Sequence, residues 1–283
     1  MPKHQPQRVS IHGGHSGQFC THAQDTLAEV IEAYIAQGFA WVGISEHMPP
    51  AHDDFRYPDE VAAGLSAAEL YTRFESYMAA GRRLQARYRD QINIYIAMET
   101  EMYPGALELA EQIIAELKPD YVVGSVHHVA GFAFDFSAEI YHAARRALGS
   151  WEALYCRYFD HQYQLLSALR PRVVGHFDLI RIYDRDYPRH MALPAVQAAI
   201  LRNLELIKDQ GAILDFNLRA LVRGAAEPYV SRPILELARN LGIPVVPGDD
   251  SHGVASVGKH LDEGMEILTE MGFDTNWVRP AAV

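Results

Sequence analysis

Short runs of apolar and β-branched residues alternate along the chain with longer segments in which apolar residues recur every three or four positions. The short runs are typical of β-strands, and the longer segments are typical of amphipathic helices. The pattern therefore predicts seven strands, at residues 9–12, 40–45, 92–98, 121–126, 172–175, 212–216 and 243–247.

Helical periodicity fills the intervals between these strands. Apolar residues from Leu27 to Ile35 have helical spacing, and Gly38 follows as a stop signal. Ser66 and Glu69 have the spacing of a capping box, which predicts the start of a helix that runs toward Tyr88. Further helices are predicted at residues 105–117, 150–169, 193–211 and 231–242, and after residue 252.

The repeated strand-helix order implies parallel strands joined by right-handed crossovers and covered on both faces. This α/β order fits both a doubly wound sheet and a closed barrel. We find no linker that would divide the chain, so the sequence predicts one domain over residues 1–283. Residues 48–65 form the longest predicted loop, which we expect to lie over a site.

Composition narrows the classes of function. The net charge is −11 and no dense run of Lys and Arg occurs, which argues against a nucleic-acid surface. No segment has the length of apolar sequence that a membrane span requires, and residues 1–8 lack the apolar core of a secretory signal. We therefore expect a cytoplasmic protein without a membrane partner, and the oligomeric state stays open.

Histidine is unusually frequent, with 14 copies, and its positions follow the predicted strands. Every strand leads into polar or metal-ligating residues, and the carboxyl ends of parallel strands meet at one edge of the sheet. Imidazoles with a few carboxylates favour zinc, iron or manganese. The candidates exceed the ligands of a single ion, so two or three divalent ions are predicted, an arrangement suited to hydrolysis of a phosphate ester.

An ordered set of motifs extends this prediction. The segments FCTHAQDTLAEVIEAYIAQGF, GISEHMPP, METEMYPG, GSVHHV, GHFDLIRIY and GDDSH occur in the order in which they occur in a known family. The chain resembles the PHP family of metal-dependent phosphoesterases and, within it, the histidinol-phosphate phosphatases. The resemblance implies a distorted (β/α)7 TIM-like barrel of the PHP type. It also implies metal ligation by His12, His15, His22, His47, Glu99, His127, His176, Asp250 and His252.

The first motif departs from the usual pattern of the family. The family separates its first two histidines by one residue, whereas two glycines separate His12 from His15 here. Side chains of a strand alternate between its faces, so one extra residue would turn the second ring away. We expect a β-bulge at Gly13 and Gly14 to restore the facing of His15.

The resemblance implies hydrolysis of a small phosphorylated substrate, L-histidinol phosphate, in histidine biosynthesis. Glu99 is expected to hold two ions together, Asp250 to act with the metals, and Asp178 to orient a ligand histidine or to protonate the leaving group. Arg219 and Arg223 are the candidates for contact with the phosphate. Two alternatives stay open: a PHP phosphoesterase for another phosphate ester or a nucleotide, and a noncatalytic metal-binding PHP module.

Overall fold

A sheet of seven parallel strands forms the centre of the molecule. The computed structural model describes residues 6–280. The strands pair in the order β1-β2-β3-β4-β7-β8-β9. Their bounds are Val9–Ser10, Trp41–His47, Asn93–Glu99, Val122–Gly124, Val173–Val174, Ile213–Asn217 and Val245–Gly248. All seven lie where the sequence predicts them.

The first and last strands approach each other, which nearly closes the sheet. The backbone N–H of Ile11, just after β1, donates to the carbonyl of Pro247 in β9 at 3.0 Å. The backbone N–H of Asp250 donates to the carbonyl of His12 at 2.9 Å. The sheet is therefore a distorted barrel of seven parallel strands, and the doubly wound alternative is wrong.

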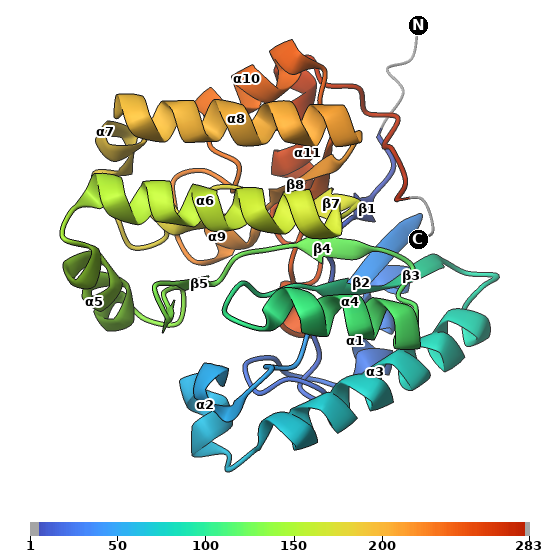
Figure 1. The fold of residues 1–283 in the computed structure, drawn as a ribbon. Coiled ribbons are helices and arrows are strands. Elements are labelled where there is room, and N and C mark those ends of the chain that lie inside the picture. The colour runs from blue at the N-terminus through green and yellow to red at the C-terminus, as the bar shows by residue number, and fades with distance from the viewer. Residues whose placement is uncertain (1–5, 281–283) are drawn as a thin grey trace, which may run out of the picture.

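Helices cover the outside of the barrel, and α6 and α8 lie side by side on it (Figure 1). The predicted helices are α1 (Leu27–Ala36), α3 (Ala67–Arg87), α4 (Ala106–Leu117), α6 (Trp151–Leu169), α8 (Pro194–Gln210), α10 (Arg232–Leu241) and α11 (Leu261–Glu270). The capping box that the sequence predicts at Ser66 and Glu69 is present. Thr26 and Glu29 form a second one at the start of α1.

Several elements were not predicted. They are the helix α5 (Ala138–Leu148), the hairpin of β5 (His128–Val129) and β6 (Phe132–Ala133), and the short helices α2 (Pro58–Ala62), α7 (Tyr187–Met191) and α9 (Arg219–Val222). Single-turn 3₁₀ helices occupy Asp53–Phe55, Leu179–Arg181 and Val254–Ser256. Residues 48–65 are thus not a plain loop, because they contain a 3₁₀ turn and α2.

Alternation along the strands separates two apolar layers. One buried cluster contains at least one residue from or beside each barrel strand: Val9, Ile11, Trp41, Ala97, Tyr121, Val123, Val173, Ile213 and Val246. The neighbouring strand residues, such as Val42 and Ile44 of β2, pack instead in the layer that contains the helices. The first cluster fills the barrel interior below the carboxyl ends of the strands.

The structure corrects the expected bulge at Gly13 and Gly14. Strand β1 ends at Ser10, so both glycines lie beyond it, and neither has a positive φ. Gly13 donates its N–H to the carbonyl of Gly43 at 2.7 Å, and a Cβ at position 13 would lie 2.3 Å from that oxygen. Glycine is required here because the backbone of β2 approaches closely, not because the strand bulges.

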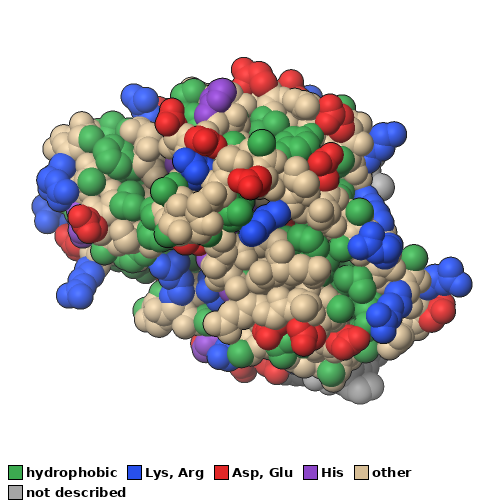
Figure 2. Space-filling view, turned by 90° about the horizontal axis from the view of Figure 1, so that it is seen from below, with side chains coloured by type: hydrophobic (Ala, Val, Ile, Leu, Met, Phe, Trp, Pro, Cys, Tyr) green, Lys and Arg blue, Asp and Glu red, His purple; other side chains and the backbone are tan. Residues whose placement is uncertain are grey.

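The surface carries charges of both signs. Acidic and basic side chains are interspersed over the face of the molecule in Figure 2. Among the described helices, none combines the length and the apolar character that crossing a bilayer requires.

Candidate metal centre

The alternation of the strands carries functional side chains into the mouth of the barrel. In β2 the interior position of Trp41 is followed, two and six residues later, by Gly43 and His47. In β3 the interior Ala97 is followed two residues later by Glu99. On the face of each strand that points into the barrel, apolar residues in the lower part therefore give way to predicted metal ligands at the carboxyl end.

Glu99 lies at the centre of the cluster and is buried. Its Oε1 lies 2.8 Å from Nε2 of His176 and 3.4 Å from Nε2 of His127. Its Oε2 lies 3.2 Å from Nε2 of His12 and 3.6 Å from Nε2 of His47. Because the two oxygens face different imidazoles, both oxygens of the carboxylate are placed where they could serve as metal ligands.

Asp250 organises the other side of the cluster. Its Oδ1 lies 3.2 Å from Nε2 of His15 and 3.6 Å from Nδ1 of His252. The ring of His22 completes this side, with its centroid 5.7 Å from that of His15 and 5.0 Å from that of His252. The structure therefore brings all nine predicted ligands together, including the two that follow the altered first motif.

Among the described residues, five sets of three satisfy the spacing of metal ligands, and three of these sets consist of predicted ligands alone. Within each set, one potential ligand atom from every residue lies within 4.8 Å of the others. The sets drawn from the predicted ligands are His15, His22 and His47; His12, His15 and Asp250; and His12, Glu99 and His176. Because the sets share residues, they form one continuous site that can bind metal ions.

Buried carboxylates contact the Nδ1 atoms of several histidine rings of the cluster. Asp215 of β8 faces Nδ1 of His12 at 2.9 Å, which leaves Nε2 of the same ring toward Glu99. Glu101 faces Nδ1 of His47 at 3.0 Å and Nδ1 of His127 at 3.1 Å. Carboxylates in this position fix the orientation of a ligand imidazole and raise its basicity.

Sequence reasoning missed Asp215, and it placed Glu101 in the barrel wall or in support of the ligands without identifying its partners. Asp215 lies two residues after Ile213, which faces the barrel interior, and Glu101 lies two residues after Glu99. The period of two was the available signal, since it places both carboxylates on the same face as the ligands. Asp249 points elsewhere, because it accepts from Ser10. Glu46 accepts from Ser16 through Oε1, and its Oε2 lies 3.5 Å from Nδ1 of His15.

The electrostatics of the cluster favour bound cations. Burial alone raises the pKa of Glu99, but the imidazoles of His12, His47 and His127 hold it well below its ordinary value. Burial also raises the pKa of Asp250, and the charge of His12 reverses that effect. Both carboxylates are therefore ionised at neutral pH and available as ligands.

Several buried imidazole nitrogens of the cluster have no hydrogen-bond partner, which bears on whether these residues suit metal ions. Among residues 6–280, Nε2 of His12, both ring nitrogens of His15 and Nδ1 of His176 are buried and lack a hydrogen-bond partner. Buried polar atoms are normally paired, so such a group of orphaned imidazole nitrogens requires an explanation. Coordination of a divalent ion by one nitrogen of each ring would provide it, and the chemistry of the donor set fits.

Two of the ligand positions have an uncommon backbone conformation. His176 has φ 22° and Asp250 has φ 44°, both in the left-handed region. This region costs energy for residues other than glycine and persists where the surroundings hold it. The conformations turn both side chains into the cluster at the points where β7 and β9 end.

A cavity of about 230 Å³ opens beside the cluster. His47, Glu99 and Asp250 contribute to its floor. Arg219 and Arg223, the predicted phosphate contacts, line it from the segment after β8. The cavity also reaches Tyr57 and Asp59 of residues 48–65, which confirms that this segment lies beside the site.

Asp178 does not lie in that lining. Its Oδ2 accepts hydrogen bonds from Nε of Arg181 at 3.0 Å and from the backbone N–H of Ser231 at 2.9 Å. Arg181 in turn donates to the carbonyl of Glu227 at 3.2 Å. The carboxylate therefore holds the segment 227–231, which carries Tyr229 to the cavity wall.

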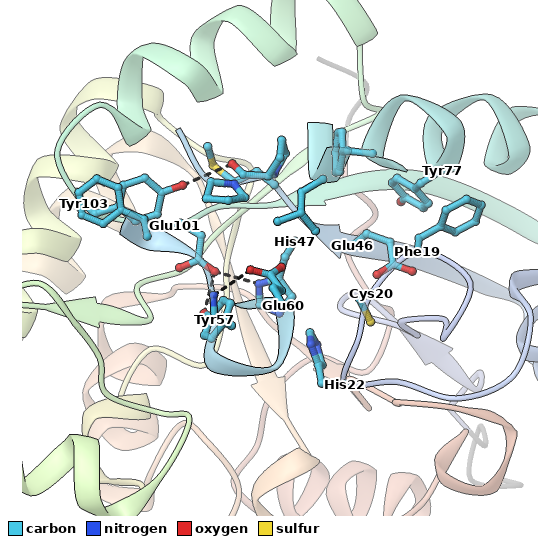
Figure 3. Close-up of a pocket in the computed structure, with 16 residues that line it drawn as sticks. Phe19, Cys20, His22, Glu46, His47, Tyr57, Glu60, Tyr77, Glu101 and Tyr103 are labelled. Carbon is cyan, nitrogen blue, oxygen red and sulfur yellow. Dashed lines mark hydrogen bonds and ion pairs between the residues drawn. The ribbon is translucent and has the colours of Figure 1, made fainter. Parts of the chain in front are cut away.

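A second, smaller pocket adjoins the cluster (Figure 3). In Figure 3, Tyr57, Glu60 and Glu101 gather beside His47, and Cys20 lies near Glu46. The hydroxyl of Tyr57 donates to Glu101 at 2.9 Å. Residues 48–65 are thereby attached to the same carboxylate that orients His47 and His127.

The comparison with family models decides the family. The model described as "PHP domain" matches residues 13–219, which is more than half of the chain. The chain belongs to the PHP domain family. The matched region of this PHP chain contains six of the nine predicted ligands; His12 directly precedes it, and Asp250 and His252 follow it.

Two relatives of this PHP chain have similar names. A protein of Schizosaccharomyces pombe named "Probable histidinol-phosphatase" is 37% identical over 268 residues, which cover 93% of this chain and 87% of the relative. A Saccharomyces cerevisiae protein named "Histidinol-phosphatase" is 28% identical, with 92% of this chain and 88% of the relative covered. The similarity therefore extends over nearly the full length of both.

Solved structures agree on the fold. A structure of HisK from Listeria monocytogenes matches with a TM-score of 0.77 at 24% identity and covers 90% of this chain and 99% of that one. Histidinol phosphate phosphatase from Lactococcus lactis, solved in complex with zinc, L-histidinol and phosphate, matches with a TM-score of 0.66 at 16% identity. It covers 98% of this chain and 97% of that one, so the two folds correspond throughout.

Proposed function

We propose that this PHP chain hydrolyses L-histidinol phosphate to L-histidinol and phosphate, as part of histidine biosynthesis. The observation that carries the proposal is the Schizosaccharomyces pombe relative, which is named for this activity and aligns over 93% of the chain. The cluster of imidazoles and carboxylates at the barrel mouth supplies the site that such an activity requires.

The nine predicted ligands would hold two or three divalent ions, of zinc, iron or manganese. Bound ions would stabilise negative charge on the phosphate oxygens. They would also lower the pKa of a water molecule, so that hydroxide is available as the nucleophile at neutral pH. Glu99 would bridge two ions, because its two oxygens face different imidazoles. Asp250, which lies beside His15 and His252, would act with these two histidines as ligands of a further ion.

Arg219 and Arg223 would bind the phosphate oxygens that do not face the cluster. Arg219 is half-buried, and its backbone N–H donates to Oδ1 of Asn217 at 3.0 Å, which fixes the start of α9 beside β8. Arg223 reaches across to Tyr183, whose hydroxyl accepts from it at 2.8 Å. Guanidinium groups suit this role because they donate two parallel hydrogen bonds to a phosphate.

Asp178 would act through position rather than by proton transfer. It accepts hydrogen bonds from Arg181 and Ser231, and it does not line the cavity. We assign it to fixing segment 227–231, and with it the Tyr229 wall of the cavity.

A panel of phosphate esters tests the proposed activity. Purified, metal-reconstituted protein is expected to hydrolyse L-histidinol phosphate with a higher kcat/KM than β-glycerophosphate, AMP and p-nitrophenyl phosphate. Equal rates on all four esters would contradict the proposed substrate. Metal binding without hydrolysis of any ester would contradict an enzymatic role.

A further inference from the structure

The cavity beside the metal cluster is lined by side chains of both charges. Outside the cluster itself, Arg219, Arg223 and Asp135 all line it. The cluster of imidazoles and carboxylates lies in the floor. A substrate with an anionic group at one end and a cationic group at the other would complement this arrangement.

Asp135 is the acidic residue of the cavity wall with unused hydrogen-bonding capacity. Asp59, also in the lining, accepts from the Thr21 hydroxyl at 2.6 Å through Oδ2 and from the backbone N–H of Glu60 at 3.1 Å through Oδ1. By contrast, Oδ1 of Asp135 is buried and has no hydrogen-bond partner among the described residues. A buried carboxylate oxygen in this condition requires a donor.

Aromatic side chains share the cavity wall with Asp135. Tyr57, Phe136 and Tyr229 line the same cavity, and the rings of Tyr57 and Phe136 have centroids 6.4 Å apart. Phe136 is 41% exposed, which is unusual for so large an apolar side chain and places it where solvent reaches the wall. Aromatic faces attract organic cations, so these rings strengthen the preference that the carboxylate creates.

The fold fixes Asp135 relative to both the metal cluster and the arginines. The backbone N–H of Phe134 donates to the carbonyl of His127 at 3.0 Å, so the segment after β6 is attached to a predicted ligand. The hydroxyl of Tyr183 donates to the carbonyl of Asp135 at 3.1 Å and accepts from Arg223 at 2.8 Å. One hydroxyl thereby connects the backbone of Asp135 to the side chain of Arg223.

We propose that Asp135 binds the protonated amine of the substrate and, with Tyr57 and Phe136 beside it, determines specificity for a phosphate ester that carries a cation. This inference rests on the proposed function, in which the substrate is L-histidinol phosphate. That molecule has a primary ammonium group and an imidazole besides its phosphate. The ammonium donates a charge-assisted hydrogen bond to the carboxylate, while the phosphate lies between the arginines and the cluster.

The test compares Asp135→Asn with the wild-type chain and with Asp54→Asn, a control at an exposed aspartate outside the cavity lining. Each metal-loaded protein is assayed with L-histidinol phosphate and with p-nitrophenyl phosphate, whose leaving group carries no cation. L-Histidinol and inorganic phosphate are also measured as inhibitors of p-nitrophenyl phosphate hydrolysis. The amide keeps the shape of the side chain and removes its charge.

For Asp135→Asn we expect kcat/KM for L-histidinol phosphate to fall about 10- to 100-fold, mainly through KM, the loss typical of a hydrogen bond to a charged group. The inhibition constant of L-histidinol is expected to rise by a similar factor. The rate on p-nitrophenyl phosphate and the inhibition by phosphate are expected to stay unchanged, which also shows that the variant folds. Asp54→Asn is expected to match the wild type on every measure.

The outcomes separate the two proposals. If the wild type prefers L-histidinol phosphate and Asp135→Asn retains that preference, the cation subsite is wrong and the proposed function stands. An equal loss on both esters would also overturn the subsite, because it would show a role in the reaction or in folding. If the wild type shows no preference for L-histidinol phosphate, the proposed function fails and the subsite fails with it.

Discussion

Asp215 shows how much of a metal site depends on residues that need not touch the metal. Its Oδ2 lies 2.9 Å from Nδ1 of His12 and also accepts from Nδ2 of Asn217 at 3.0 Å. The carboxylate therefore selects the tautomer of His12 that presents Nε2 to Glu99. Without it, the ring would keep its packing but lose its fixed protonation and orientation.

For Asp215→Asn we expect metal affinity to fall about 10- to 100-fold, the usual cost of losing a carboxylate partner of a ligand histidine. Activity at saturating metal is expected to recover substantially, because the predicted ligands remain. The measurement is a titration of metal-free protein with zinc, followed both by binding and by hydrolysis. Asp209→Asn, at an exposed position near the end of α8, is the matched control.

Unchanged zinc affinity in Asp215→Asn, together with unchanged activity, would contradict the assigned role. It would show that His12 is oriented by its packing alone. Loss of activity that zinc does not restore would contradict it in the other direction, since it would place Asp215 in the reaction itself.

At the scale of single residues, the sequence predicted the ligands better than their supports. The nine candidate ligands, which the structure brings together, were predicted because imidazoles and carboxylates follow successive strands and because the motifs resemble a family. Asp215 was missed because it lies inside a strand in an apolar segment, where a single carboxylate carries no motif. The close approach of Gly13 to Gly43 was missed because it joins distant segments.

At the scale of elements, local sequence signals determine where helices begin. The Ser66 hydroxyl accepts from the backbone N–H of Glu69 at 3.3 Å, and the Glu69 carboxylate accepts from the backbone N–H of Ser66 at 2.8 Å. These reciprocal bonds satisfy backbone groups that the first turn of α3 leaves free. Hydrogen bonds donated to the Glu69 carboxylate by the hydroxyl and the backbone N–H of Ser66 hold the pKa of Glu69 below its ordinary value.

Ser66→Ala is expected to destabilise the protein by about 1 kcal/mol, the typical cost of losing an N-cap hydroxyl. The measurement is the midpoint of urea unfolding, with an unchanged slope. Ser76→Ala is the control, because Ser76 is exposed in the middle of α3, where alanine favours the helix slightly. Equal stability of Ser66→Ala and the wild type would contradict the contribution of the cap.

The elements that the sequence failed to predict lie beside the cavity. The β5–β6 hairpin is only two residues deep on each side, too short for an alternating pattern to be recognised. It nevertheless places Asp135 and Phe136 in the cavity wall. Helix α2 was hidden in residues 48–65 because a single turn does not develop helical periodicity.

At the scale of the whole molecule, the parallel order of the strands produces the site. Seven strands deliver their carboxyl ends to one mouth of the barrel, so residues as distant in sequence as His15 and Asp250 lie 3.2 Å apart. The sequence predicted this convergence because strand-helix alternation implies parallel strands. It left a doubly wound sheet and a barrel open, since closure depends on the contact between Ile11 and Pro247, which no local pattern encodes.

The central claim is that the nine clustered residues form a metal centre that hydrolyses L-histidinol phosphate. The most direct measurement is the rate of phosphate release from L-histidinol phosphate by chelator-stripped protein during titration with zinc or manganese. We predict negligible activity in the stripped protein, and recovery that saturates at two to three bound ions per chain in wild type and is absent in Glu99→Gln. Full activity in the stripped protein, or equal recovery in Glu99→Gln, would contradict the account.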